Sequence, residues 1–138
     1  MLEDFKISVK IKIAVLWTSV MFCYLYEDYF ELYVPNKIER IISGESLLNT
    51  PMRLFGASWV LIIPALMIFL SILLTPKLSR LLNILFGTCY TALMLWIASN
   101  YHDKWLTFAV LFAIVESILT VIIVWYAWKW PRQNQVRQ

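Results

Sequence analysis

The chain has 138 residues, of which 61% are hydrophobic and only 15% are charged, and its formal net charge is +3. A soluble domain has about a quarter charged residues and less than half apolar residues, so this composition excludes an ordinary soluble protein. Seven Trp, seven Tyr and eight Phe are also too many for a soluble surface to hide at this length. The sequence predicts a polytopic membrane protein, and the small positive charge gives no indication of a nucleic-acid partner.

Four apolar runs are each long enough to cross the hydrocarbon core, which takes about 20 helical residues. Backbone polar groups in lipid have to be satisfied within their own segment, so each run is expected to be helical. The runs leave no room for a soluble domain, and we predict a single domain over residues 1–138, an all-α, antiparallel four-helix transmembrane bundle. The predicted spans are residues 11–33, 54–74, 81–99 and 105–129.

The connection between the first two spans carries its own structural signals. Pro35 is expected to end the first helix, and Lys37–Ile42 has the pattern of a short amphipathic helix. We expect this segment to lie on the outer membrane surface or to cap the bundle. Thr50 or Asn49 followed by Pro51 is a start signal for the second helix, with a capping side chain before a proline in the first turn.

Lys and Arg are distributed unequally between the two ends of the predicted bundle, with eight at the end that holds both termini and four at the other. The positive-inside rule then predicts a multi-pass protein of the inner (plasma) membrane with both termini in the cytoplasm. The N-terminus lacks the features of a cleavable signal peptide, so the first helix is expected to remain as a span. The larger group is Lys6, Lys10, Lys12, Lys77, Arg80, Lys129, Arg132 and Arg137, and the smaller is Lys37, Arg40, Arg53 and Lys104.

Glu116 lies in the middle of the last span, with no other charge within ten residues on either side. An ionisable group near the bilayer midplane costs at least a few kcal/mol, so it usually has a partner or a function. Ala109, Ala113 and Thr120 share its helix face, and small residues allow another helix to approach closely. One interpretation is a protonated Glu116 that bonds a neighbouring hydroxyl and helps packing. We favour the other, that Glu116 marks a functional site.

A polar stripe runs along the first span with one member every four residues, a spacing that places them on one helix face. Such a stripe is expected to face the bundle rather than lipid. The alternative is that the helix leaves the membrane early, so that its acids lie among head groups and pair with Lys37 or Arg40. The stripe consists of Ser19, Cys23, Glu27 and Glu31, with Tyr24 and Asp28 beside it.

Residues of all four spans fall at about the same depth as Glu116. In the second span, Pro64 frees a backbone carbonyl near Val60, and the resulting kink is either structural or opens a gap. We hypothesise a mid-membrane cavity that is open to the outer leaflet. The predicted ligand-binding residues are Glu116, Glu27, Asp28, Tyr24, Tyr90 and Thr91.

No motif of a specific enzyme is present. Cys23 and Cys89 are far apart in sequence and do not form Cys-x-x-Cys, so structural thiols are favoured over a redox pair, and whether the two touch is open. The single His102 cannot supply a multi-histidine metal site or bis-histidine haem ligation. We predict no catalytic residue, no metal site and no cofactor. Lipid isomerisation by paired carboxylates is kept as a less favoured enzymatic alternative.

Several aromatic-rich motifs carry a resemblance: LWTSVMF at residues 16–22, DYF at 28–30, LYVP at 32–35, IPALM at 63–67 and VWYAWKWP at 124–131. In these motifs the chain resembles a bacterial family of uncharacterised small inner-membrane proteins, over nearly its whole length. The resemblance implies four spans and no assigned activity. In architecture alone the chain is also similar to the sterol-isomerase and sigma-2-receptor fold, whose members bury carboxylates in a bundle that holds an amine or a sterol.

Three functions are compatible with these features. In the first, which we favour, Glu116 with Glu27 or Asp28 binds a small lipophilic or cationic molecule, or a lipid from the surrounding bilayer. The second is a proton- or cation-coupled transporter, similar in outline to small multidrug exporters, although those carry their carboxylate on the first helix and have balanced flanking charges. In the third, an accessory subunit pairs Glu116 with a basic residue of a partner helix. Homo-oligomers are compatible with the sequence.

Overall fold

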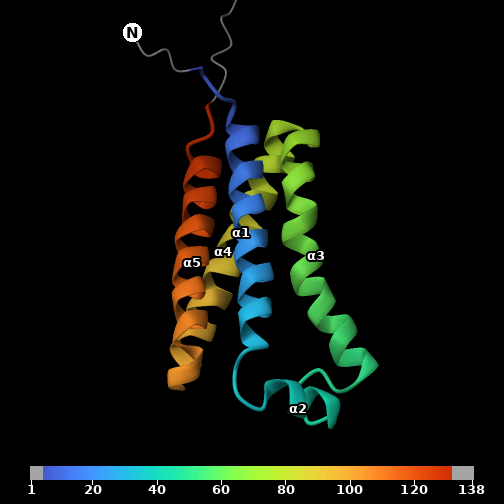
Figure 1. Ribbon diagram of the computed structural model, residues 1–138. Helices are drawn as coiled ribbons and strands as arrows, with labels where there is room; N and C mark the ends of the chain where they lie inside the picture. Colours follow the sequence, from blue (N-terminus) through green and yellow to red (C-terminus); the bar gives the residue numbers. More distant parts are fainter. Residues whose placement is uncertain (1–4, 132–138) are drawn as a thin grey trace, which may run out of the picture.

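The computed structural model describes residues 5–131, and every regular element in that range is helical. Two basic residues of the predicted cytoplasmic group, Arg132 and Arg137, therefore lie outside the described residues. Figure 1 shows the helices in chain order. They are α1 (Val9–Glu31), α2 (Lys37–Ile42), α3 (Pro51–Leu73), α4 (Pro76–Asn100), the 3₁₀ turn η1 (Lys104–Leu106) and α5 (Thr107–Trp128).

Four helices are long and apolar enough to cross a membrane: α1, α3, α4, and α5 together with η1. Their lengths of 23 to 25 residues correspond to roughly 35 Å of helix at about 1.5 Å per residue. That exceeds the hydrocarbon thickness of about 30 Å. The predicted all-α fold class with four spanning helices is confirmed.

The short helix after the first span is also confirmed, with the predicted bounds Lys37–Ile42. It begins after Asn36, which adopts the left-handed conformation (φ 61°), and is followed by Gly44 at φ 78°. Asn and Gly tolerate this region better than other residues, so each allows a sharp change of chain direction next to the helix. These two turns set α2 across the end of the bundle (Figure 1).

Helix α3, the second of the predicted spans, begins as its sequence predicts. Thr50 is in an extended conformation, and its hydroxyl accepts a hydrogen bond from the backbone N–H of Arg53 at 3.3 Å. Pro51 occupies the first helical position, where its missing N–H costs nothing. The fourth helix likewise begins with a proline, Pro76.

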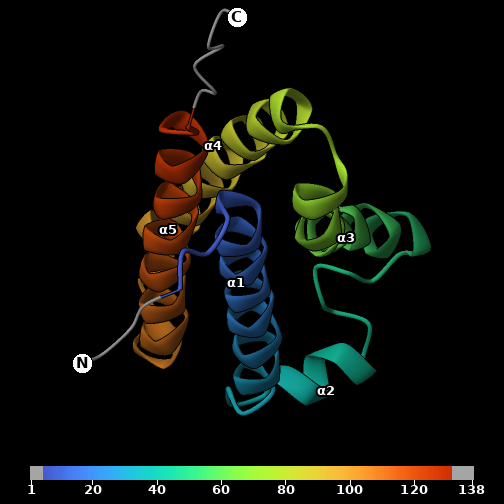
Figure 2. The ribbon, with the colours of Figure 1, turned by 90° about the horizontal axis from the view of Figure 1, so that it is seen from above.

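The four spans are antiparallel neighbours, and the described ends of the chain lie at the same end of the bundle, opposite α2 (Figure 1). Seen along the bundle, α1 lies between α3 and α5, and α4 lies beside α5 (Figure 2). The contact between α3 and α4 is much smaller than the other three. The buried residues of α3 all lie in its second half: Pro64, Met67 and Ser71. The first half of α3 therefore leans away from the bundle toward α2 (Figure 1).

The core lies where α1, α4 and α5 meet. Ile13, Trp17 and Val20 on α1 are fully buried, and Ala113 and Ile123 on α5 are fully buried opposite them. Large apolar residues cover the outside, among them Phe22, Leu25, Phe69, Ile118 and Val121, each about half exposed. A soluble protein rarely exposes such a continuous apolar surface, whereas a lipid-facing surface requires it.

Candidate functional site

Glu116 lies at the centre of α5 and points into the bundle, with no exposed surface. Ala109, Ala113 and Thr120 on the same face are buried with it, as the sequence predicts. Neither carboxylate oxygen of Glu116 has a hydrogen-bond partner within residues 5–131. Burial of an unpaired carboxyl group costs several kcal/mol in an apolar environment. Packing alone does not explain a carboxyl group in this position.

Tyr24 on α1 presents the second unpaired group. Its side chain is 5% exposed, and its hydroxyl is buried without a hydrogen-bond partner among the described residues. Tyr24 and Glu116 lie within electrostatic range of each other, so the two unpaired polar groups belong to one region between α1 and α5. Both unpaired groups, a hydroxyl and a carboxyl, are buried where α1 and α5 pack against each other.

Tyr90 on α4 packs beside Tyr24, with ring centroids 6.5 Å apart, and against Trp17 at 6.0 Å in an edge-to-face contact. Its hydroxyl donates a hydrogen bond to the Val60 carbonyl on α3 at 2.7 Å. That carbonyl is the acceptor that Pro64 leaves free, because proline has no N–H. Tyr90 therefore contributes its ring to the region around Tyr24, whereas its hydroxyl holds α3 in place.

Thr91 connects α4 to α5 next to Glu116. The Thr91 and Thr120 hydroxyl oxygens are 2.7 Å apart, and Thr91 also donates to the Gly87 carbonyl. Thr120 in turn lies 2.9 Å from the Glu116 carbonyl oxygen. These hydroxyls satisfy backbone carbonyls and each other, and they leave the Glu116 carboxyl group without a partner.

Glu27 and Asp28 lie between Glu116 and the α2 end of the bundle. Glu27 is half-buried and Asp28 is exposed, and both are within electrostatic range of Glu116. Neither forms an ion pair within the described part of the chain. Glu31, one turn further out, does pair with Lys37, which is one of the two ion pairs expected if the acids of α1 lie among the head groups. The unpaired acids become more buried from Asp28 through Glu27 to Glu116.

Tyr101, in the turn after α4, is half-buried and within electrostatic range of Glu27, Asp28 and Glu31. Burial raises the pKa of Tyr101, and the nearby charges of Glu27, Glu31 and Asp28 raise this pKa further. The turn between α4 and η1 therefore places an aromatic side chain within electrostatic range of the acids of α1. Tyr101 is not among the predicted site residues, because its distance from α1 depends on the tertiary fold.

A buried polar network, which was not predicted from the sequence, lies on the other side of the core. Asn83 on α4 has no exposed surface and accepts hydrogen bonds from Trp17 Nε1 at 2.7 Å and from Ser71 Oγ at 3.2 Å. Its amide nitrogen donates to the Ser79 carbonyl at 2.8 Å. The network joins α1, α3 and α4. An Asn within an apolar run was the signal that could have indicated it.

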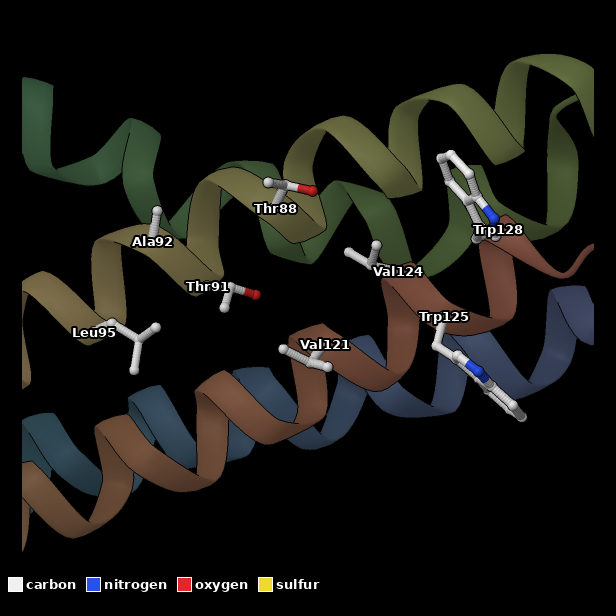
Figure 3. Close-up of a pocket in the computed structure, with 8 residues that line it drawn as sticks. All are labelled: Thr88, Thr91, Ala92, Leu95, Val121, Val124, Trp125 and Trp128. Atoms are coloured by element: carbon white, nitrogen blue, oxygen red, sulfur yellow. The ribbon is translucent and has the colours of Figure 1, made fainter.

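Cys23 and Cys89 are not joined by a disulfide; Cys23 is half-buried and Cys89 is exposed. Within residues 5–131, no three His, Cys, Asp or Glu side chains are grouped closely enough to hold a metal ion. A groove of about 510 Å³ lies between α4 and α5 (Figure 3). Of the predicted site residues, only Thr91 lines it. Its full lining is Thr88, Thr91, Ala92, Leu95, Val121, Val124, Trp125 and Trp128.

A family model matches residues 3–137, nearly the whole chain, and its description is "Family of unknown function (DUF6326)". The chain belongs to this family of unknown function. Comparisons with curated proteins and with solved structures give no significant match. Membership in DUF6326 therefore agrees with the resemblance seen in the sequence motifs and assigns no activity to the unpaired groups around Glu116.

Proposed function

We propose that this DUF6326 protein binds a small cationic molecule, or the cationic head of an amphiphile, inside its bundle at Glu116. The observation that carries the proposal is the pair of buried polar groups without partners, the Glu116 carboxyl group and the Tyr24 hydroxyl. A bound ammonium or similar group would satisfy both, since it neutralises the carboxylate and replaces the missing hydrogen bonds.

The acids of α1 support an entry path from the α2 end. Asp28 is exposed and Glu27 is half-buried, and neither is paired with a base in residues 5–131. Charges of one sign lining a low-dielectric path raise the local concentration of the opposite ion. A cation would therefore reach Asp28 first, then Glu27, and finally Glu116.

The half of the bundle between Glu116 and the chain termini is closed, which favours binding over transport. Transport requires that Glu116 also becomes accessible from the end that holds the termini. On that side the core is closed by the Trp17 side chain and by Asn83, both fully buried and bonded to each other. A proton- or cation-coupled transporter remains the second candidate, and it would have to open this hydrogen bond in each cycle.

An accessory subunit that pairs Glu116 with a basic partner helix fits the geometry less well. Glu116 has no exposed surface, because α1 and α4 already enclose it together with α5. A basic side chain from another protein would reach the carboxyl group only after the bundle had opened.

The proposal is tested with the purified protein and a lipophilic ammonium ion, octylammonium, whose binding is measured by isothermal titration calorimetry. Its N–H groups can donate hydrogen bonds to both side chains, and like the Lys amine it stays protonated below about pH 10. We expect Glu116→Gln to abolish binding and Tyr24→Phe to weaken it several-fold. Glu39→Gln is the matched control, because Glu39 is an exposed acid on α2. Since the cation needs an ionised carboxylate, binding to the wild-type protein should strengthen as the pH rises. Equal binding by wild type and a folded Glu116→Gln variant would reject the proposal.

A further inference from the structure

The groove between α4 and α5 faces outward and has nearly uniform apolar walls. Thr88, Thr91 and Ala92 line it from α4, and Val121 and Val124 line it from α5 (Figure 3). The two short threonines and the alanine leave space that larger side chains would fill. Thr88 and Leu95 are seven residues apart, so the groove runs along about 10 Å of helix.

The threonine hydroxyls do not offer this groove any free donors. Thr88 donates to the Ile84 carbonyl at 2.7 Å, and Thr91 is bonded to Gly87 and Thr120. The walls therefore present carbon surface almost exclusively. A hydrocarbon chain suits such a groove, whereas a polar ligand would lose hydration there without compensation.

One end of the groove carries positive charge. Trp128 lines that end, and next to it Arg80 Nε donates to the Ala127 carbonyl at 3.1 Å. The Lys129 ammonium lies 4.7 Å from the Trp125 ring centroid on the same end of α5. Within residues 5–131, neither Arg80 nor Lys129 forms an ion pair with a carboxylate. Two positive charges are therefore available at the membrane-interface end of an apolar groove.

We propose that this groove binds an anionic phospholipid, with one acyl chain between α4 and α5 and the phosphate against Arg80 and Lys129. The tryptophans at this end, Trp125 and Trp128, are of the residue type that favours the interfacial region. Basic residues near the ends of spanning helices attract anionic head groups with about 1 kcal/mol each. The site is separate from Glu116 and does not depend on the function proposed for it.

The test uses the full chain in nanodiscs of equal amounts of phosphatidylglycerol and phosphatidylcholine, with retained lipids counted by native mass spectrometry after release into mild detergent. We expect preferential retention of phosphatidylglycerol. Arg80→Gln and Lys129→Gln should each lower the retained ratio about fivefold, whereas Arg80→Lys should keep most of it. Lys104→Gln, at the opposite end of α5, is the charge-matched control and should change nothing.

A groove-filling variant tests the acyl-chain half of the proposal. Ala92→Phe should lower the retention of both lipids while helicity, measured by circular dichroism, is preserved. If Ala92→Phe does not fold, the charge variants decide. Equal retention of the two lipids by the wild type would overturn the proposal. The proposal would also be overturned if Lys104→Gln lost as much phosphatidylglycerol as Arg80→Gln. A dimer whose interface excludes lipid from this groove, and which Ala92→Phe dissociates, would overturn it as well.

Discussion

Glu116 and Asn83 are both polar residues without exposed surface, but their surroundings differ. The Asn83 amide is bonded on both its oxygen and its nitrogen, so its burial is compensated. The Glu116 carboxyl group has no partner in the part of the chain that the structure describes. The cost of burying a polar group depends on whether its hydrogen bonds are made. Asn83 therefore contributes to folding, whereas Glu116 reduces stability and is explained better by a function.

This difference predicts opposite effects for two apolar substitutions. Asn83→Leu should destabilise the fold by about 1–3 kcal/mol, because it leaves the Trp17 N–H buried without an acceptor. Glu116→Met, which removes an unpaired group and keeps a similar volume, should leave stability unchanged or increase it. The measurement is unfolding by sodium dodecyl sulfate in mixed micelles, followed by circular dichroism. Equal destabilisation by both substitutions would show that Glu116 has a structural partner in the folded protein.

At the scale of single helices, one long-range hydrogen bond holds α3 at the point where Pro64 interrupts the helix's own backbone hydrogen bonds. Pro64 cannot donate to the Val60 carbonyl, and the Tyr90 hydroxyl from α4 takes the place of the missing N–H. Because the first half of α3 has no buried residue, this bond fixes α3 near the point where it leaves the bundle.

The Tyr90 bond predicts a coupling between two distant residues. Tyr90→Phe should cost about 1–2 kcal/mol in the wild-type background, because the Val60 carbonyl then lacks a donor. In a Pro64→Ala background the cost should fall, since the substituted alanine supplies the backbone N–H of a regular helix. A double-mutant cycle on unfolding free energies measures this coupling. Independent, additive effects would contradict the assignment of the bond.

The contact between α4 and α5 depends on a glycine. A Cβ atom on Gly87 would lie 2.7 Å from Val124 Cγ2, too close for real atoms, whereas a Cβ on Gly56 of α3 would meet nothing within 4 Å. Both glycines are inside helices, where alanine is favoured by up to about 1 kcal/mol. Only Gly87 therefore has a packing reason to be glycine.

We accordingly expect Gly56→Ala to be neutral or stabilising. Gly87→Ala should be less stable than Gly56→Ala by about 1–3 kcal/mol, the usual cost of overpacking. Val124→Ala in the Gly87→Ala background should recover part of the loss. Thermal unfolding of the wild type and these three variants in detergent checks this series. A neutral Gly87→Ala would mean that α4 and α5 separate slightly at little cost.

For the whole molecule, local sequence patterns predict the elements better than they predict the contacts between them. The Lys37–Ile42 helix, the Thr50 cap and the inward face of Glu116 all follow from spacing within one segment. The Asn83 network and the Tyr90 bond join helices far apart in sequence, and they depend on how each helix is rotated and tilted. One apolar span does not specify its neighbours, because lipid and protein are equally apolar surroundings.

In the candidate site, too, the sequence predicts features of single helices but not the contacts between helices. Periodicity indicates that Glu27, Tyr24 and Glu116 lie on inner faces, but not that Tyr90 directs its hydroxyl to α3. Nor does it show that Tyr101 lies near the acids of α1. The α4–α5 groove was also not predictable, since it arises from small residues on two helices that meet only in the folded chain.

The orientation of the molecule is predicted from its charges. The described ends of the chain share one end of the bundle, opposite α2 (Figure 1). At the terminal end Lys10 donates to the Ile72 and Leu74 carbonyls, and Arg80 to that of Ala127, so these bases also cap helix ends. Because Lys and Arg are retained on the cytoplasmic side during insertion, this end should face the cytoplasm.

Two single-cysteine variants test this orientation in a background in which both native cysteines are replaced by alanine. Ser46→Cys lies in the loop after α2, and Thr75→Cys lies in the turn between α3 and α4, at opposite ends of the bundle. A membrane-impermeant maleimide should label the Ser46→Cys variant in intact cells and the Thr75→Cys variant only after permeabilisation. The reverse pattern would invert the entry path proposed for cations, because the exposed acids near α2 would then face the cytoplasm. Labelling of both variants in intact cells would indicate two insertion orientations, in which case the charge difference between the ends does not fix the topology.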